Sequence, residues 1–207
     1  MRETTWEFSE AWAGEDDVLR EARARASELG CVPVGPGGAA ALRVLAAALG
    51  ARAVVEIGTG TGVSGLALLQ GMRPDGILTT VDVEPEHQRA AKEAFAAAGV
   101  AGNRARVISG RALDVLPRLA DGGYDLVFCD GEKTEHTAYL TEALRLLRVG
   151  GAVAFDGSLL DAVADPAQRD EQTTAVRELL AAVKGDERLV SSLLPVGDGL
   201  LVAVKRA

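Results

Sequence analysis

The chain alternates between short runs of apolar residues and longer segments in which apolar residues recur at helical spacing. Five of the runs are rich in β-branched residues and nearly continuous in apolar character, as strands buried on both faces are. Strands that alternate with helices predict right-handed crossovers and a mostly parallel sheet. The five expected strands cover residues 52–57, 77–83, 104–109, 124–130 and 151–156, and the helices between them cover 63–71, 85–98, 111–120 and 136–147.

Two further apolar runs, 188–194 and 200–205, follow a predicted helix at 170–184, and two more helices are expected before the first strand, at 15–29 and 38–49. Only the segment PVGDG separates the last two runs, which is too short for a parallel crossover and suits an antiparallel hairpin. We therefore expect an α/β fold: a Rossmann-like, doubly wound, seven-stranded and mostly parallel sheet with a C-terminal antiparallel hairpin and helices on both faces.

Both tryptophans, Trp6 and Trp12, lie near the start of the chain together with Phe8. An apolar arm left in water is unfavourable, so this segment should pack on the rest of the protein or on a second subunit. We expect residues 1–207 to form one domain, with residues 1–50 serving as a lid or as the contact of a homodimer.

The charge and the cysteine content restrict the partners and the compartment. A net charge of −8 argues against a nucleic-acid-binding surface, which normally carries a basic stripe. The two cysteines form no C-x-x-C spacing, which favours a reducing compartment. We see no segment of signal-peptide type and no apolar run of the roughly 18 residues that a membrane span needs. These features predict a cytoplasmic protein with no nucleic-acid or membrane partner.

A glycine-rich loop, VVEIGTGTGVSG, follows the first expected strand and opens a helix. Its glycines let the backbone turn tightly and approach a ligand at the helix N-terminus. Their spacing is G-x-G-x-G rather than the G-x-G-x-x-G of dinucleotide-binding loops, and Glu56 beside them suits a ligand with an ammonium group. Asp82 ends the second expected strand, next to this loop, where a carboxylate can accept the two hydroxyls of a ribose. Asp82 alone fits either NAD or S-adenosylmethionine (SAM).

Four segments in order, EIGTGTGVS, VDVEPE, YDLVFCDGEK and LLRVGGAVAFD, resemble the class I SAM-dependent methyltransferases. More narrowly, they are similar to the O-methyltransferase family that includes the catechol and caffeoyl-CoA O-methyltransferases. The resemblance implies transfer of a methyl group from SAM to an oxygen of a small molecule, a phenolic or catechol hydroxyl. It also implies a set of residues that bind the cofactor: Val34, Glu56, Gly58, Thr59, Gly60, Gly62, Ser64, Asp82, Arg111, Ala112 and Asp130.

Asp130 and Asp156 end two neighbouring expected strands and should converge near the sulfonium of SAM. Carboxylates that converge can bind Mg²⁺ or another divalent cation, and the resemblance implies that these two are metal ligands and that Lys133 is a general base. The third ligand of the family is an Asn immediately after the second Asp, where this chain has Gly157. Three alternatives follow: the metal remains, with water or an acid such as Asp161 completing its shell; it binds weakly, with substrate; or metal dependence is lost.

If metal dependence is lost, the resemblance leaves Lys133, Asp130 and His136 to handle the proton. His136 is expected at a helix start, either as a proton acceptor or substrate contact or as an exposed residue of the first turn. We interpret His87 as a solvated helix residue. The insert 157–172 should overhang the pocket and help to select the acceptor.

The sequence therefore favours a SAM-dependent O-methyltransferase. One alternative is a SAM-binding protein whose reaction centre is eroded at Gly157 and which transfers nothing. A second alternative is an NAD(P)-dependent enzyme, which the glycine spacing and the terminal hairpin disfavour.

Overall fold

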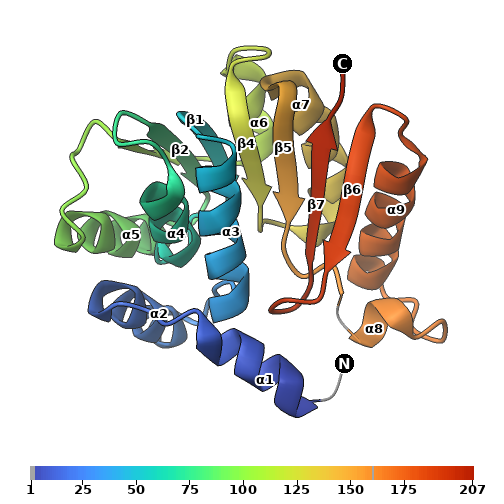
Figure 1. Cartoon of the computed structure of the whole chain (residues 1–207), viewed down its shortest axis with the longest axis horizontal. Helices are drawn as coiled ribbons and strands as arrows, with labels where there is room; N and C mark the ends of the chain where they lie inside the picture. Colours follow the sequence, from blue (N-terminus) through green and yellow to red (C-terminus); the bar gives the residue numbers. More distant parts are fainter. Residues whose placement is uncertain (1–2, 160) are drawn as a thin grey trace.

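The computed structural model describes residues 3–159 and 161–207, apart from the side chains of residues 3, 4 and 161. Within this part of the chain, seven strands form one sheet in the order β3-β2-β1-β4-β5-β7-β6 (Figure 1). The first five strands run parallel, and β7 pairs antiparallel with both β5 and β6. The strands are β1 (Ala53–Ile57), β2 (Ile77–Asp82), β3 (Ala105–Ser109), β4 (Tyr124–Cys129), β5 (Leu147–Phe155), β6 (Leu189–Leu194) and β7 (Leu200–Lys205).

Helices cover both faces of the sheet, as the pattern of buried strands predicts (Figure 1). Successive residues of a strand point to opposite faces, so Val54 packs with the helices of one layer and Val55 with those of the other. The first layer comprises α2 (Asp17–Leu29), α3 (Pro36–Ala48), α4 (Val63–Gly71) and α5 (Pro85–Ala97). The second comprises α6 (Ala112–Val115), the short 3₁₀ turn η1 (Leu116–Arg118), α7 (His136–Leu146) and α9 (Glu171–Gly185).

The elements agree with the sequence-based fold, with differences in their bounds, of which three have a clear structural feature behind them. The expected helix 111–120 is divided into α6 and η1, because Pro117 cannot donate the amide bond that would continue an α-helix. Helix α3 begins at Pro36, a residue suited to the first helical position, rather than at residue 38. Strand β5 begins at Leu147, directly after α7, and its pairing with β4 shifts register between Tyr124 and Leu126. In the described residues, no helix is long and apolar enough to cross a membrane.

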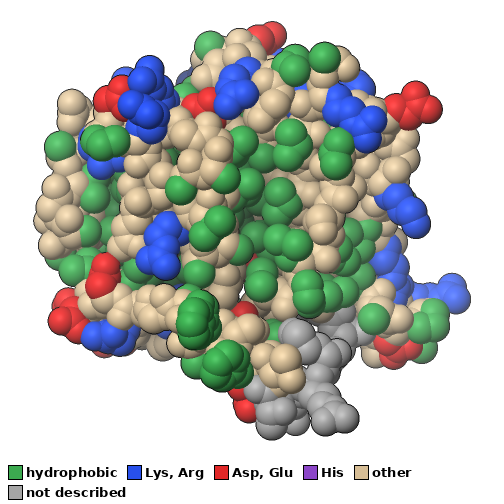
Figure 2. Space-filling view, in the orientation of Figure 1, with side chains coloured by type: hydrophobic (Ala, Val, Ile, Leu, Met, Phe, Trp, Pro, Cys, Tyr) green, Lys and Arg blue, Asp and Glu red, His purple; other side chains and the backbone are tan. Residues whose placement is uncertain are grey.

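Helix α1 (Glu3–Trp12) is fastened to two distant parts of the fold by Glu10. One carboxylate oxygen of this buried residue accepts the amide of Gly37, at the start of α3, at 2.8 Å. The other oxygen accepts the amide of Gly197, in the loop between β6 and β7, at 2.8 Å. The aromatic side chains of α1 face outward: Phe8 is 68 % exposed and Trp12 80 %. Figure 2 shows hydrophobic side chains gathered over this helix.

Candidate active site

The carboxyl ends of the four central parallel strands form one edge of the sheet. Hydrogen bonds between strands continue past the strand ends there. Gly58 donates to the carbonyl of Val81 at 2.9 Å, and Asp130 donates to that of Ile57 at 2.8 Å. Asp156 donates to the carbonyl of Cys129 at 3.1 Å. These bonds fix the backbone of the glycine loop, Asp130 and Asp156 along a single edge.

Gly58 allows the loop to pass close to the end of β4. Its φ angle is +91°, a region that side-chain-bearing residues avoid. A Cβ atom on this residue would lie 2.4 Å from the carbonyl oxygen of Asp130. Any residue larger than glycine would therefore push the loop away from Asp130.

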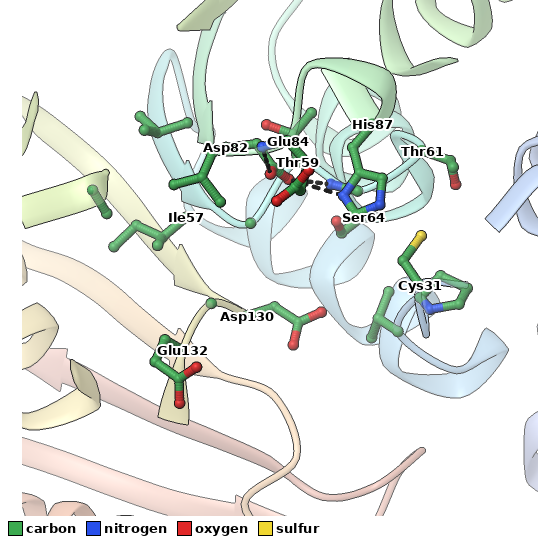
Figure 3. A pocket seen from close by; sticks show the side chains of 18 of the residues that line it. Cys31, Ile57, Thr59, Thr61, Ser64, Asp82, Glu84, His87, Asp130 and Glu132 are labelled. Carbon is green, nitrogen blue, oxygen red and sulfur yellow. Dashed lines mark hydrogen bonds and ion pairs between the residues drawn. The ribbon is translucent and has the colours of Figure 1, made fainter. Parts of the chain in front are cut away.

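A cavity of about 490 Å³ opens above this edge, between the glycine loop and the segments that follow β2, β3 and β4 (Figure 3). Nine of the residues predicted to bind a cofactor line it. They are Val34, Gly58, Thr59, Gly60, Ser64, Asp82, Arg111, Ala112 and Asp130. The structure therefore brings together residues from five separate stretches of the chain.

Asp82 is held by backbone amides on both sides. One of its oxygens accepts the amide of Gly60 at 2.9 Å, and the other accepts the amide of Glu84 at 2.9 Å. Nδ1 of His87 lies 3.7 Å from the Asp82 carboxylate, and Figure 3 shows these side chains side by side at the cavity. A carboxylate offers about four acceptor directions, so Asp82 keeps capacity for the hydroxyls of a ligand.

His87 is not the solvated helix residue that the sequence suggested. Its side chain is 20 % exposed and lines the cavity beside Asp82. The first turn of α5 begins directly after β2, so its side chains reach the same strand end as Asp82 does. The position of EPEH after Asp82 was the signal that could have identified His87.

Glu56 and Gly62 lie outside the cavity lining. Glu56 is fully buried, and among the described residues neither of its carboxylate oxygens has a hydrogen-bond partner. Burial raises the pKa of Glu56 to about 7, against the effect of the nearby Thr80 and Ser64 hydroxyls. Gly62 caps α4 with a φ of +91° and packs against Phe95 of α5, which gives it a role in packing.

Asp130, Lys133 and Asp156 form the second part of the site. Nζ of Lys133 donates to the backbone oxygen of Asp156 at 2.8 Å and lies 3.7 Å from Oδ1 of Asp130. Oδ1 of Asp156 is buried and has no hydrogen-bond partner in the described part of the chain. Burial raises the pKa of both carboxyls; the negative charge of Asp156 raises that of Asp130 further, and Lys133 opposes the shift in each.

These residues do not make the three-ligand metal site that the resemblance implies. Residue 157 is a glycine with φ of +65°, and a Cβ atom there would lie 2.6 Å from Nζ of Lys133. The lysine ammonium therefore occupies the space into which a side chain at this position would begin. In residues 3–159 and 161–207, no group of three or more His, Cys, Asp or Glu side chains is arranged to hold a metal ion. The side chain of Asp161, considered above as a further ligand, lies outside the described residues.

His136 is fully buried and does not line the cavity. Its ring packs between Tyr139 and Phe155, with ring centroids 5.9 Å and 5.2 Å away. Burial and the positive charge of Lys133 lower the pKa of His136 to about 3, so its imidazole is neutral. His136 is thus the first residue of α7, as expected, but it is buried in the core and not exposed.

The insert after β5 is anchored at both of its ends. The amides of Ser158 and Leu159 donate at 2.9 Å to the carbonyls of Gly199 and Asp198, beside β7. Beyond the short helix α8 (Asp161–Ala164), the guanidinium of Arg177 donates to four backbone carbonyls. The four acceptors are Ala162, Val163, Asp165 and Gln168. Arg177 of α9 therefore ties residues 162–168 to that helix.

Comparison with known proteins adds four findings. Residues 10–206 match the family model described as O-methyltransferase. A Mycobacterium tuberculosis protein named as an O-methyltransferase is 49 % identical over 204 residues, which are 98 % of this chain and 91 % of that protein. The crystal structure of the O-methyltransferase TomG from Streptomyces achromogenes, in complex with SAM, superimposes with a TM-score of 0.88 at 31 % identity over all of both chains. A Corynebacterium glutamicum protein gives a TM-score of 0.91 at 33 % identity over 99 % of this chain and 97 % of that one.

Proposed function

The chain belongs to the O-methyltransferase family, and we propose that it binds SAM and transfers its methyl group to a hydroxyl oxygen of a phenol or catechol. The observation that carries the proposal is the position of Asp82. Backbone amides of Gly60 and Glu84 hold this carboxylate at the wall of a cavity of about 490 Å³, a volume in the range of small-molecule sites.

The residues present fit SAM at both ends of the molecule. Asp82 would accept the ribose hydroxyls, and the segment at Arg111 and Ala112 would lie beside the adenine. The buried carboxyl of Glu56, whose oxygens have no hydrogen-bond partner among the described residues, lies beside Gly65 at the start of α4. An ammonium group nearby would stabilise its ionised form. The SAM bound to TomG supports this assignment, because the two chains superimpose along their whole length.

Bound SAM would supply a methyl group whose bond to sulfur breaks as its bond to the acceptor oxygen forms. The protein side chains would position the acceptor oxygen and favour the loss of its proton. Asp130 lines the cavity, and the ammonium of Lys133 lies 3.7 Å from its carboxylate. We assign these two side chains to the acceptor hydroxyl: Lys133 holds the oxygen, and the proton that the hydroxyl loses passes to this pair. Alignment of oxygen, methyl and sulfur then accounts for most of the rate.

The test combines calorimetric titration of SAM and of NAD with a methyl-transfer assay over a panel of phenols and catechols. We expect saturable SAM binding, no NAD binding, and transfer to at least one hydroxyl. Saturable SAM binding without transfer to any member of a broad panel would favour the SAM-binding protein without activity. Binding of NAD in place of SAM would refute the proposal.

A further inference from the structure

The ammonium of Lys133 supplies a positive charge beside Asp130 and Asp156. Nζ of Lys133 lies between the two strand ends that carry Asp130 and Asp156, bonded to the backbone of one and 3.7 Å from the carboxylate of the other. The side chain of Lys133 is 20 % exposed, so water screens this charge only in part. An ammonium in this position can offset the two carboxylates and attract a developing phenolate.

The donor set disagrees with a divalent cation at the same place. Mg²⁺ takes six oxygen ligands in a near-ideal octahedron, and Asp130 and Asp156 would supply oxygens without the third side-chain ligand that the resembled family uses. The next residue, Gly157, offers no ligand, and the lysine amine fills the space beside it. The ammonium of Lys133 lies 3.7 Å from Oδ1 of Asp130 and already offsets part of the negative charge that would attract a cation.

We propose that this enzyme holds its acceptor with the ammonium of Lys133 and binds no divalent cation between Asp130 and Asp156. The proposal rests on the proposed methyl transfer for its catalytic half. The statement about the cation stands on the donor set alone and is tested separately.

The cation is tested by titrating Mn²⁺ into the full chain and following bound metal by electron paramagnetic resonance. We expect no saturable binding to the wild type at micromolar to low-millimolar Mn²⁺. The variant Gly157→Asn adds an oxygen ligand and displaces the amine, and asparagine tolerates a positive φ. It should bind Mn²⁺ on the order of tenfold or more tightly than the wild type.

The matched control is Gly157→Ala, which displaces the amine and supplies no ligand. It is expected to bind Mn²⁺ no better than the wild type. Saturable micromolar binding by the wild type itself, at a stoichiometry of one, would overturn the proposal whatever the variants do.

The catalytic half is tested with an acceptor that the wild type methylates. We expect the initial rate to be unchanged by EDTA and by added Mg²⁺. Lys133→Met, which keeps the length of the side chain and removes its charge, should lower kcat on the order of 100-fold and leave the SAM dissociation constant unchanged. Loss of activity in EDTA with recovery in Mg²⁺, or a Lys133→Met variant with wild-type kcat, would refute the role of the ammonium. If no acceptor is methylated at all, the proposed function fails and the Mn²⁺ titration still decides the question of the cation.

Discussion

Glu56 should make the protein without ligand less stable as the pH rises, and Glu56→Gln should remove this effect. The carboxyl is fully buried, and its pKa is raised from 4.5 to about 7. A carboxyl whose pKa is higher in the folded state favours folding in its neutral form. Its contribution is therefore present below pH 4.5 and is lost as the pH rises through 7.

The magnitude follows from the two pKa values. Each unit of difference corresponds to about 1.4 kcal/mol. Between pH 5 and pH 8, a group that moves from 4.5 to about 7 lowers the free energy of unfolding by about 2.5 kcal/mol. Glutamine does not titrate, so the variant should lack this part of the pH dependence. Comparing the change with pH in each protein cancels any constant cost of burying the amide.

The assay is urea unfolding of both proteins at pH 5 and pH 8, followed by far-ultraviolet circular dichroism. The wild type should lose about 2.5 kcal/mol more than the variant between the two conditions. Equal losses, within the roughly 10–15 % uncertainty of the extrapolation, would refute the reasoning. They would mean that Glu56 is paired or hydrated in solution.

The ionisation of Glu56 should also make SAM binding depend on pH. If the ammonium of SAM stabilises ionised Glu56, the wild-type dissociation constant should rise about tenfold from pH 8 to pH 6, relative to Glu56→Gln. Titration of the ligand itself affects both proteins and cancels in this ratio. Calorimetry at the two pH values measures it.

Three further outcomes follow from other parts of the structure. Asp82→Asn should weaken SAM binding about 10- to 100-fold in calorimetry, because hydrogen bonds to a charged acceptor contribute about 1.5–3 kcal/mol. Glu86→Gln, at an exposed residue in the first turn of α5, should not change it. The side chain of Trp12 is 80 % exposed. If α1 forms the contact of a homodimer, Trp12→Glu should halve the mass measured by light scattering. A wild-type protein that is already monomeric would contradict this contact. Arg177→Ala should raise the KM for the acceptor and make residues 162–168 more sensitive to proteolysis, without changing SAM affinity. Arg169→Ala, at an exposed residue nearby, should change neither the acceptor KM nor the proteolysis.

Most of the cavity lining was readable from the sequence because its residues follow strands directly. A glycine loop after β1 and an acid at the end of β2 acquire their positions from local pattern and sheet topology. The fold was predicted for the same reason, down to the hairpin between β6 and β7. Where prediction missed the wall of the cavity, at His87, the residue was only one helical turn past a correctly placed strand end.

The surroundings of Lys133, Asp156 and Gly157 depend on contacts between segments far apart in the chain. No local pattern indicates that Lys133 fills the space beside Gly157, or that Glu10 accepts an amide from Gly197. The burial of His136 was readable in part, because it shares a helical face with Tyr139 and other buried residues of α7. Its contact with the ring of Phe155, in β5, could not be predicted from the sequence.

The order of the last two strands bears on how the protein folds. In the described sheet, β6 pairs only with β7, which lies between it and β5. The next-to-last strand therefore joins the sheet only through the last one, as the outer strand of a hairpin. Glu10 attaches α1 to the loop between these strands, a contact that spans 187 positions of the chain. Contacts of such long range form late, because the loop they close costs much entropy. Amide hydrogen exchange should thus be faster around β6 and α1 than in the central strands β1 and β4.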